Sequence, residues 1–229
     1  MHRSFAALTF AALAACSAEQ VHAIRCATNE PTFAIEQVSA LESSYRIAGG
    51  SDAVTLTEDP SKNPPGSIWS VSTVDVLVMI PDDKFAPTAV DQTLAVDVWD
   101  GTSATATQPW VVTQTLDPNQ ITWEQVHLQT PSGGKDFHRG WMHFDFRPLI
   151  PDSGMTSTSF MVAVHWPNAK SPLVGSSNYN RACPRTWTDF NDGIGWRDNG
   201  ITNKGDNCCW PMLNVNTQVV TLKASCDGT

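Results

Sequence analysis

The sequence predicts an all-β protein, a single antiparallel β-sandwich of the jelly-roll-like type. Apolar segments rich in Val, Ile, Trp and Phe recur along the chain and are separated by turns of Gly, Pro, Asn and Asp. No long segment between them has helical periodicity, which disfavours an α/β sheet. Only 16% of the 229 residues are charged and the Trp count is 9, a composition that argues against intrinsic disorder.

The first half of the chain supplies four expected strands. They end at turn formers such as Asp100-Gly101 and Asp117-Pro118. Residues 102–108 are small and polar, so we expect a loop there. The four strands are predicted over residues 53–56, 75–80, 94–100 and 110–116.

The second half begins with two alternating strands and continues with a strand that is apolar throughout. Residues 122–130 and 140–149 place apolar and polar side chains on opposite faces, because side chains alternate along a strand. Residues 160–166 (FMVAVHW) are apolar on both faces, which is typical of a buried central strand. Residues 212–225 are expected to close the sheet beside the N-terminus, as one long strand or two short ones.

The domain organisation has one ambiguous part, an N-terminal segment over residues 24–50. The apolar residues of 35–41 would share one face of a short helix, but irregular strand fits equally well. The sandwich domain itself is expected over residues 51–229.

A long loop is expected over residues 176–210, a stretch rich in Asn, Asp and Gly with little periodicity. Loops of this length in a compact domain are functional or disordered. Trp187, Phe190 and Trp196 lie within it and cysteines flank it. These features favour an ordered loop.

The N-terminus has the features of a signal peptide. A basic start precedes an apolar stretch over residues 4–15 that is too short to span a bilayer. Two processing routes fit. Residues 13–16 (LAAC) match a bacterial lipobox, in which the signal peptide is 1–15 and Cys16 carries a lipid anchor; ordinary cleavage after Ala23 would instead remove 1–23. Either route predicts a secreted or cell-envelope protein that meets a membrane only through a lipid on Cys16.

Export makes the cysteines candidates for disulfide bonds. The chain has 6 cysteines, and setting Cys16 aside leaves an odd number, so at least one stays outside any internal pair. A disulfide across the long loop would stabilise the fold by about 3–4 kcal/mol. A strained bond between adjacent cysteines is an alternative for the second pair. The expected pairs are Cys26 with Cys226, and Cys183 with Cys208 or Cys209.

Charge and motifs disfavour several function classes. The chain has 14 Lys and Arg against 23 Asp and Glu, a net charge of −9. An acidic surface repels phosphate backbones, so nucleic acid is disfavoured as a partner. The sequence contains no Gly-x-Ser-x-Gly elbow, HExxH or CxxC motif, so the common nucleophile, zinc and redox sites find no support.

The strands at 122–130 and 140–149 supply the candidate site. If they pair as a hairpin with Thr130 opposite Gly140, His127 faces His143 at about 5 Å. Val126 and Leu128 would then belong to the core. The outward face would gather two indoles, two imidazoles and a carboxylate: Trp123, His127, Trp141, His143 and Asp145.

Three interpretations of this face stay open. Flat indoles stack on sugar rings while imidazole, amide and carboxylate groups bind hydroxyls, so the face would suit a glycan. His127, His143 and Asp145 would alternatively form a two-His-one-carboxylate metal site. The simplest alternative is a surface whose polar side chains satisfy one another.

Calcium is a further candidate ligand, near Asp189, Asn191 and Asp192. Their side chains offer the oxygen ligands that calcium prefers, but their spacing is not that of an EF-hand. Asx turns explain the same residues equally well.

Glycoside hydrolysis needs a pair of carboxylates, and these can come from distant strands. Asp97, Glu124 and Asp145 each lie in an expected strand. They are therefore candidates for an enzyme that acts on polysaccharide, although most strand carboxylates line a solvated rim.

Residues 94–196 contain an LAVDVWD strand, Trp123 with Val126-x-Leu128 and Pro131, Gly140-Trp141 with Phe144-x-Phe146, an FMVAVHW strand and Gly195-Trp196. In these features the segment resembles the jelly-roll-like accessory domains found beside adhesins or carbohydrate-active enzymes in secreted bacterial proteins. The resemblance covers about half the chain and implies a non-catalytic binding or surface role. The sequence departs from it by having no catalytic neighbour and by its cysteine-flanked loop.

We therefore expect a non-catalytic extracellular or cell-envelope module that binds a ligand such as a glycan. Two other functions remain as alternatives: a polysaccharide-acting enzyme of the envelope, and a purely structural or adhesive surface protein.

Overall fold

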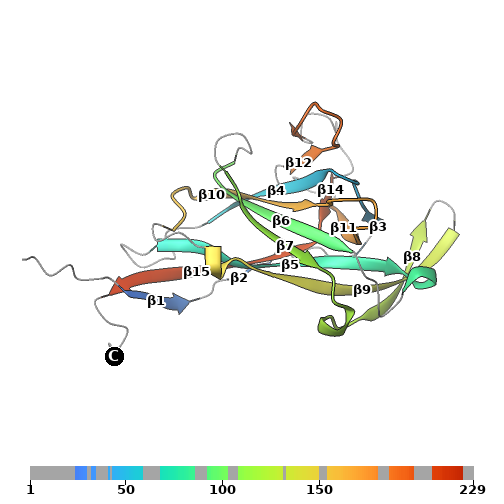
Figure 1. Ribbon diagram of the computed structural model, residues 1–229, viewed down its shortest axis with the longest axis horizontal. Coiled ribbons are helices and arrows are strands. Elements are labelled where there is room, and N and C mark those ends of the chain that lie inside the picture. Colours follow the sequence, from blue (N-terminus) through green and yellow to red (C-terminus); the bar gives the residue numbers. More distant parts are fainter. Residues whose placement is uncertain are drawn as a thin grey trace, which may run out of the picture.

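The computed structural model describes residues 24–29, 32–34, 41, 43–58, 68–85, 92–102, 108–130, 133–149, 154–179, 186–198 and 208–223. Within them the chain forms two antiparallel sheets that pack face to face, which confirms the predicted all-β sandwich. Figure 1 shows the long strands of the larger sheet in the lower layer and the smaller sheet crossing above them.

The larger sheet is organised around β5 (Ile68–Pro81), a strand much longer than the expected 75–80. One edge of β5 pairs with β15 (Leu213–Lys223) and then with β11 (Leu173–Tyr179), and the other edge pairs with β9 (Gly133–Asp145). The outer strands of this sheet are β1 (Ile24–Asn29) and β2 (Thr32–Ala34) on β15, β3 (Ser43–Tyr45) and β14 (Cys208–Pro211) on β11, and β8 (Glu124–Thr130) on β9.

The smaller sheet has the order β13-β12-β4-β10-β6-β7. One of its central strands, β10, was predicted from a continuous apolar run. The run is continuous because both faces of the strand are covered: Phe160, Val162 and Val164 face the main core, while Met161 and Ala163 belong to a second cluster. The strands are β4 (Ser51–Thr57), β6 (Thr93–Asp100), β7 (Trp110–Thr115), β10 (Ser159–His165), β12 (Thr186–Asp189) and β13 (Arg197–Asp198).

A β-bulge in β5 keeps both halves of this strand in the core. Thr73 lies opposite Asn216 and Val71 lies opposite Thr217, so Ser72 has no partner in β15. The extra residue reverses the alternation, and Trp69 and Val71 therefore face the same core as Val74 and Val76 beyond it. Ser72 also donates its hydroxyl to the carbonyl of Asn216, at 3.1 Å.

The loop expected over 176–210 contains regular structure that the sequence pattern did not reveal. β12 pairs with β4 and with β13, and β14 pairs with β11. In residues 24–50 the described parts form the short strands β1, β2 and β3, while residues 35–40, where a helix was one expectation, lie outside the described residues. The cysteine expectations involving Cys16, Cys183 and Cys226 also fall outside them.

Helical structure in the described residues is limited to three 3-10 turns. In these parts of the chain, no helix is long and apolar enough to span a bilayer. The turns are η2 (Asp82–Lys84), η3 (Pro118–Gln120) and η4 (Arg147–Leu149).

Truncating the centre of the core tests this packing. Phe144 lies on β9 and is 0% exposed, so Phe144→Ala should lower the free energy of unfolding by about 3–5 kcal/mol, measured by urea denaturation. Val111→Ala is the control: Val111 is 47% exposed, so we expect a change within about 0.5 kcal/mol. Equal effects at the two positions would contradict the assignment of the core.

Candidate functional site

The strands β8 and β9 form a hairpin, as expected, but their register differs from the expected one. Thr130 lies opposite Gly133, and His127 lies opposite Asp136. Gly140, the expected partner of Thr130, is seven residues beyond Gly133 along the chain, and a register change by an odd number moves side chains to the other face of the sheet. β9 begins earlier than predicted because its polar first residues, which suggest a loop, are extended and paired with β8.

The expected gathering of five site residues on one face is therefore wrong. Trp123 packs against the main core, and His127 shares its face with Asp136, whose Oδ1 lies 2.7 Å from His127 Nδ1. Trp141, His143 and Asp145 lie on the opposite, outward face of the larger sheet, because Met142 and Phe144 between them are core residues. The two-His-one-carboxylate metal set is consequently divided between two faces.

The apolar residues of β8 also lie on the face opposite to the expected one. Val126 and Leu128 do not face the main core; they pack with Met79 and Phe137 in a smaller outward cluster. Alternation separates the two faces of a strand, but it does not show which face meets the second sheet.

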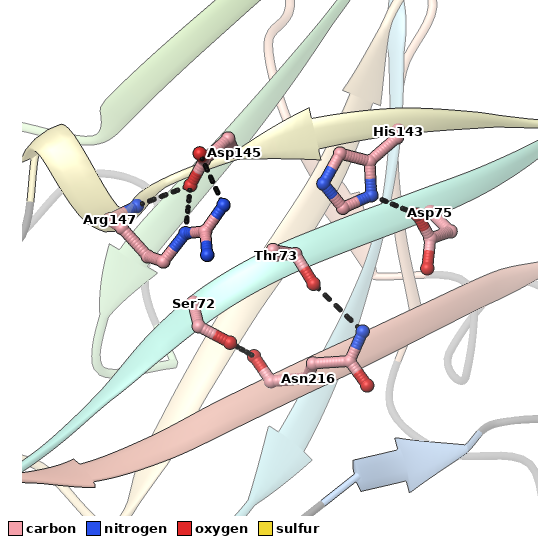
Figure 2. Close-up of polar contacts among 7 residues, drawn as sticks. All are labelled: Ser72, Thr73, Asp75, His143, Asp145, Arg147 and Asn216. Carbon is pink, nitrogen blue, oxygen red and sulfur yellow. Dashed lines mark hydrogen bonds and ion pairs between the residues drawn. The ribbon is translucent and has the colours of Figure 1, made fainter. Parts of the chain in front are cut away.

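The outward face around His143 is polar and well paired (Figure 2). Nδ1 of His143 lies 2.6 Å from Oδ1 of Asp75 on the neighbouring strand. Both carboxylate oxygens of Asp145 accept from Arg147, at 2.9 Å from Nε and 2.8 Å from Nη2. These hydrogen bonds from Arg147 lower the pKa of Asp145 below its ordinary value. Asp145 is thus engaged in the protein, whereas His143 keeps 56% of its side chain exposed.

A groove of about 390 Å³ adjoins this face, between the edge strand of one sheet and β9 of the other. It exists because β8 pairs with β9 only as far as Arg139, while β9 continues along β5 to Asp145. None of the described strands pairs with the edge of β9 after Arg139. The groove is lined by Trp141, Met142 and His143 of β9, Gln114 and Thr115 of β7, and Asp117, Gln120 and Ile121 around η3.

The floor of this groove at η3 is held by a dense set of hydrogen bonds. Asp117 accepts from the backbone N–H of Asn119 at 3.0 Å and from Nε2 of Gln120 at 3.0 Å. On the other side, Nε1 of Trp123 donates to the carbonyl of Pro118 at 2.9 Å. Trp123, which was expected in the site, therefore holds η3 in place beside the groove. The residues of β7 and η3 were not expected in the site, although the Asp117-Pro118-Asn119 turn signal marked their position.

The candidate glycosidase carboxylates do not form a pair. Asp97 lies on the outward face of the smaller sheet, because its neighbours Val96 and Val98 face the core. Glu124 accepts from Arg139 at 2.7 Å on β9, and Asp145 lies six residues further along that strand, about 20 Å away at the usual rise. Their spacing matches neither geometry of glycoside hydrolysis.

A polar row on the outward face of the smaller sheet was not expected from the sequence. Oγ of Ser51 lies 2.9 Å from Nδ1 of His165 on the paired strand. Burial raises the pKa of Asp97 to about 6, and the nearby His165 partly opposes this rise. No described donor makes a hydrogen bond to Asp97, so these three residues do not form the connected chain that a catalytic triad requires.

A second carboxylate is buried inside the sandwich. Asp52 on β4 accepts from Oγ1 of Thr188 at 2.8 Å and from the hydroxyl of Tyr45, and it is 3% exposed. Burial raises its pKa to about 6, against the opposing effect of these two hydrogen bonds. The side chain of Asp52 therefore links β4 to β12 in the smaller sheet and to β3 in the larger sheet.

The calcium candidate residues form Asx turns. Oδ1 of Asp189 accepts from the backbone N–H of Asn191 at 2.8 Å, and Oδ1 of Asp192 accepts from that of Ile194 at 3.1 Å. The other carboxylate oxygen of Asp192 accepts from Arg197. In the described residues no group of three or more His, Cys, Asp or Glu side chains is arranged to hold a metal ion. Calcium remains a prediction, and its binding would require these oxygens to exchange partners.

For the cysteine predictions, the structure gives only the backbone positions of Cys26, Cys208 and Cys209. Cys26 in β1 lies opposite Thr221 in β15, so the strands nearest the two termini are neighbours. Cys208 and Cys209 lie in β14, opposite Tyr179 and Asn178. The disulfide pairs and the lipid anchor stay predictions.

Comparison with known proteins gives no further guide, since no protein-family model, no curated protein and no solved structure matches the chain. The function is therefore argued from the described residues.

The raised pKa of Asp52 predicts a stability that depends on pH. Between pH 4 and 6 the folded protein binds more protons at Asp52 than the unfolded chain does, so stability should fall as pH rises through this window and level off above it. The loss should be at most about 3 kcal/mol for this group. Asp52→Asn should reduce the slope measured by denaturation at several pH values.

Asp97 should contribute with the same sign, because its pKa is also raised to about 6. The double variant Asp52→Asn/Asp97→Asn should therefore lose most of the slope. A double variant that keeps the full slope would contradict the burial of these two carboxylates.

Proposed function

We propose that the chain is a non-catalytic extracellular or cell-envelope module that binds a glycan in the groove between β7 and β9. The observation that carries this proposal is the groove itself, which is lined by Trp141, by the exposed His143 and by Gln114 and Gln120. Its volume of about 390 Å³ lies in the usual range for small-molecule sites, roughly 300–1,000 Å³.

The mixture of groups suits a sugar. A sugar ring has an apolar face formed by its C–H groups and a rim of hydroxyls, so it needs a flat apolar surface beside donors and acceptors. Trp141 offers the flat surface, and the side chains of Gln114, Gln120 and His143 offer donors and acceptors at the same opening.

Rigidity of the groove supports binding. Asp117 holds η3 with hydrogen bonds to Asn119 and Gln120, and Asp75 holds the ring of His143. Ligand binding would therefore cost little ordering of these side chains, which favours affinity. The part of β9 after Arg139 adds backbone N–H and C=O groups at the same edge.

A polysaccharide-cleaving enzyme is the less supported alternative. Asp145 is engaged with Arg147, Glu124 is paired with Arg139, and Asp97 lies on the other sheet. Asp75 is a diagonal neighbour of Asp145 on the outward face, but Asp75 is paired with His143 and Asp145 with Arg147, so neither carboxylate is left for acid–base work. We therefore propose binding without catalysis.

Replacing the indole of Trp141 tests the site. Trp141→Ala should weaken binding to the recognised polysaccharide at least about tenfold, since truncating a central aromatic side chain in a binding site typically costs more than 1.4 kcal/mol. Affinity electrophoresis on a panel of soluble polysaccharides, followed by calorimetry on any that retard the wild type, gives the measurement.

Trp196→Ala is the matched control, because Trp196 lies just before β13, away from the groove, and its ring contacts Trp99 of the smaller sheet. It should leave the affinity unchanged. Equal weakening by both variants, or no retardation of the wild type on any polysaccharide, would refute the proposal. Release of new reducing ends during incubation would instead favour the enzyme.

A further inference from the structure

A second, smaller cavity of about 90 Å³ lies at one end of the sandwich, where β5 ends and β11 begins. Its lining includes three cations from three separate parts of the chain: Arg46 after β3, Lys84 in η2 and Lys170 in the connection between β10 and β11. This concentration is notable in a chain with 14 basic and 23 acidic residues. From this geometry we propose that the cavity binds an oxoanion, namely the carboxylate, sulfate or phosphate group of a ligand.

The two acidic residues that precede Lys84 are paired with other basic side chains. Asp82 and Asp83 precede Lys84 in η2, but Oδ1 of Asp82 lies 2.7 Å from Nε2 of His138, and Oδ1 of Asp83 lies 3.8 Å from Nζ of Lys135. In the described residues, Lys84 itself has no ion-pair partner. Its charge is thus available to a ligand in the cavity.

The walls of the cavity are tied together by the protein. Nη1 of Arg46 donates to the carbonyl of Ser171 at 2.6 Å, which joins the segment after β3 to the β10–β11 connection. Asn168 shapes that connection: its Oδ1 accepts from the backbone N–H of Lys170 at 2.7 Å, and its carbonyl accepts from that of Ser171. Since a guanidinium has five N–H donors, Arg46 keeps others for a ligand.

Electrostatics favours an anion at this position. Arg46 and Lys84 bring two positive charges to this small volume, and both attract a bound anion. Two of the three cations are lysines, which act as point charges and do not select a planar carboxylate by geometry. Affinity should therefore follow the charge of the anion and should decrease with ionic strength.

Gln92 also lines the cavity, but its Oε1 is shielded from solvent and does not contact a ligand there. The recognised feature of the ligand is therefore its anionic group. The site is separate from the groove at Trp141 and does not depend on the proposed function.

The test uses the full chain and an NMR titration at low ionic strength with sodium sulfate, inorganic phosphate, acetate, glucuronate and glucose, with sodium chloride as the ionic-strength control. We expect saturable shifts at Arg46, Lys84 and Lys170. Sulfate and phosphate should bind more tightly than acetate, and glucose should not bind. Tighter glucuronate than sulfate would identify a sugar acid, and the reverse order would identify a sulfate or phosphate ester.

The variant Lys84→Ala should weaken sulfate binding at least about tenfold, as expected for a lost charged contact. Arg197→Ala changes the net charge equally but lies on β13 in the other sheet, so it should leave sulfate binding unchanged. Equal weakening by both variants would show a general charge effect and overturn the proposal, as would shifts that never saturate. Because Lys84→Ala leaves the Trp141 groove intact, loss of sulfate binding without loss of polysaccharide binding separates this site from that one.

Discussion

The strand β5 is the constraint on which the rest of the structure depends. It pairs with β15 and β11 along one edge and with β9 along the other, so the positions of nearly all strands in the larger sheet follow from its register. The bulge at Ser72 allows one continuous strand to supply core residues from both of its halves. Without that extra residue, either Trp69 and Val71 or Val74 and Val76 would face solvent, and half of the contact with the smaller sheet would be lost.

The register of β9 on β5 determines both the outward face and the groove. Because Phe144 is opposite Val74 in the core, His143 must face outward, where it meets Asp75. The groove arises because the two edges of β9 are paired over unequal lengths. β9 pairs with β5 as far as Asp145, whereas it pairs with β8 only as far as Arg139. A strand edge that none of the described strands pairs with, Trp141 and a rigid turn are thereby brought to one place.

The smaller sheet shows how covering both faces of a strand produces a continuous apolar run. Residues of β10 alternate between the main core and a second cluster, which is covered by Trp99 together with Trp187 and Trp196 from the β12–β13 hairpin. The described part of the long polar segment over residues 176–210 therefore covers the outer face of the smaller sheet. Its aromatic residues explain its order, and its Asp and Asn side chains close its turns.

The sequence allowed the fold class and most of the strands to be predicted, because alternation and turn residues are local signals. β4, β6, β7, β8 and β10 lie close to their expected positions. The alternation of side chains along β9 also correctly placed Trp141, His143 and Asp145 on the face of the sheet that Phe144 does not occupy.

The rest depended on long-range pairing, which local signals do not contain. The first residues of β9 are polar and include Gly133 and Gly134, so their composition is that of a loop. Because the prediction treated them as a loop, it shifted the register of β8 on β9 by an odd number of residues. Partners from distant strands, such as Asp75 for His143 and His165 for Ser51, are likewise invisible in a local pattern. Predicting the groove required knowledge of where β8 begins to pair with β9, which is a property of the long-range pairing.

The central claim is that the register of β8 on β9 puts His127 and His143 on opposite faces of the sheet. Nuclear Overhauser effects between backbone protons measure this register directly. Cross-strand contacts should join Gln125 to His138 and His127 to Asp136, with none between His127 and His143. Contacts that join His127 to His143 and Gln125 to Asp145 would contradict the account, because the five residues would then share one face and the groove at Trp141 would be closed by β8.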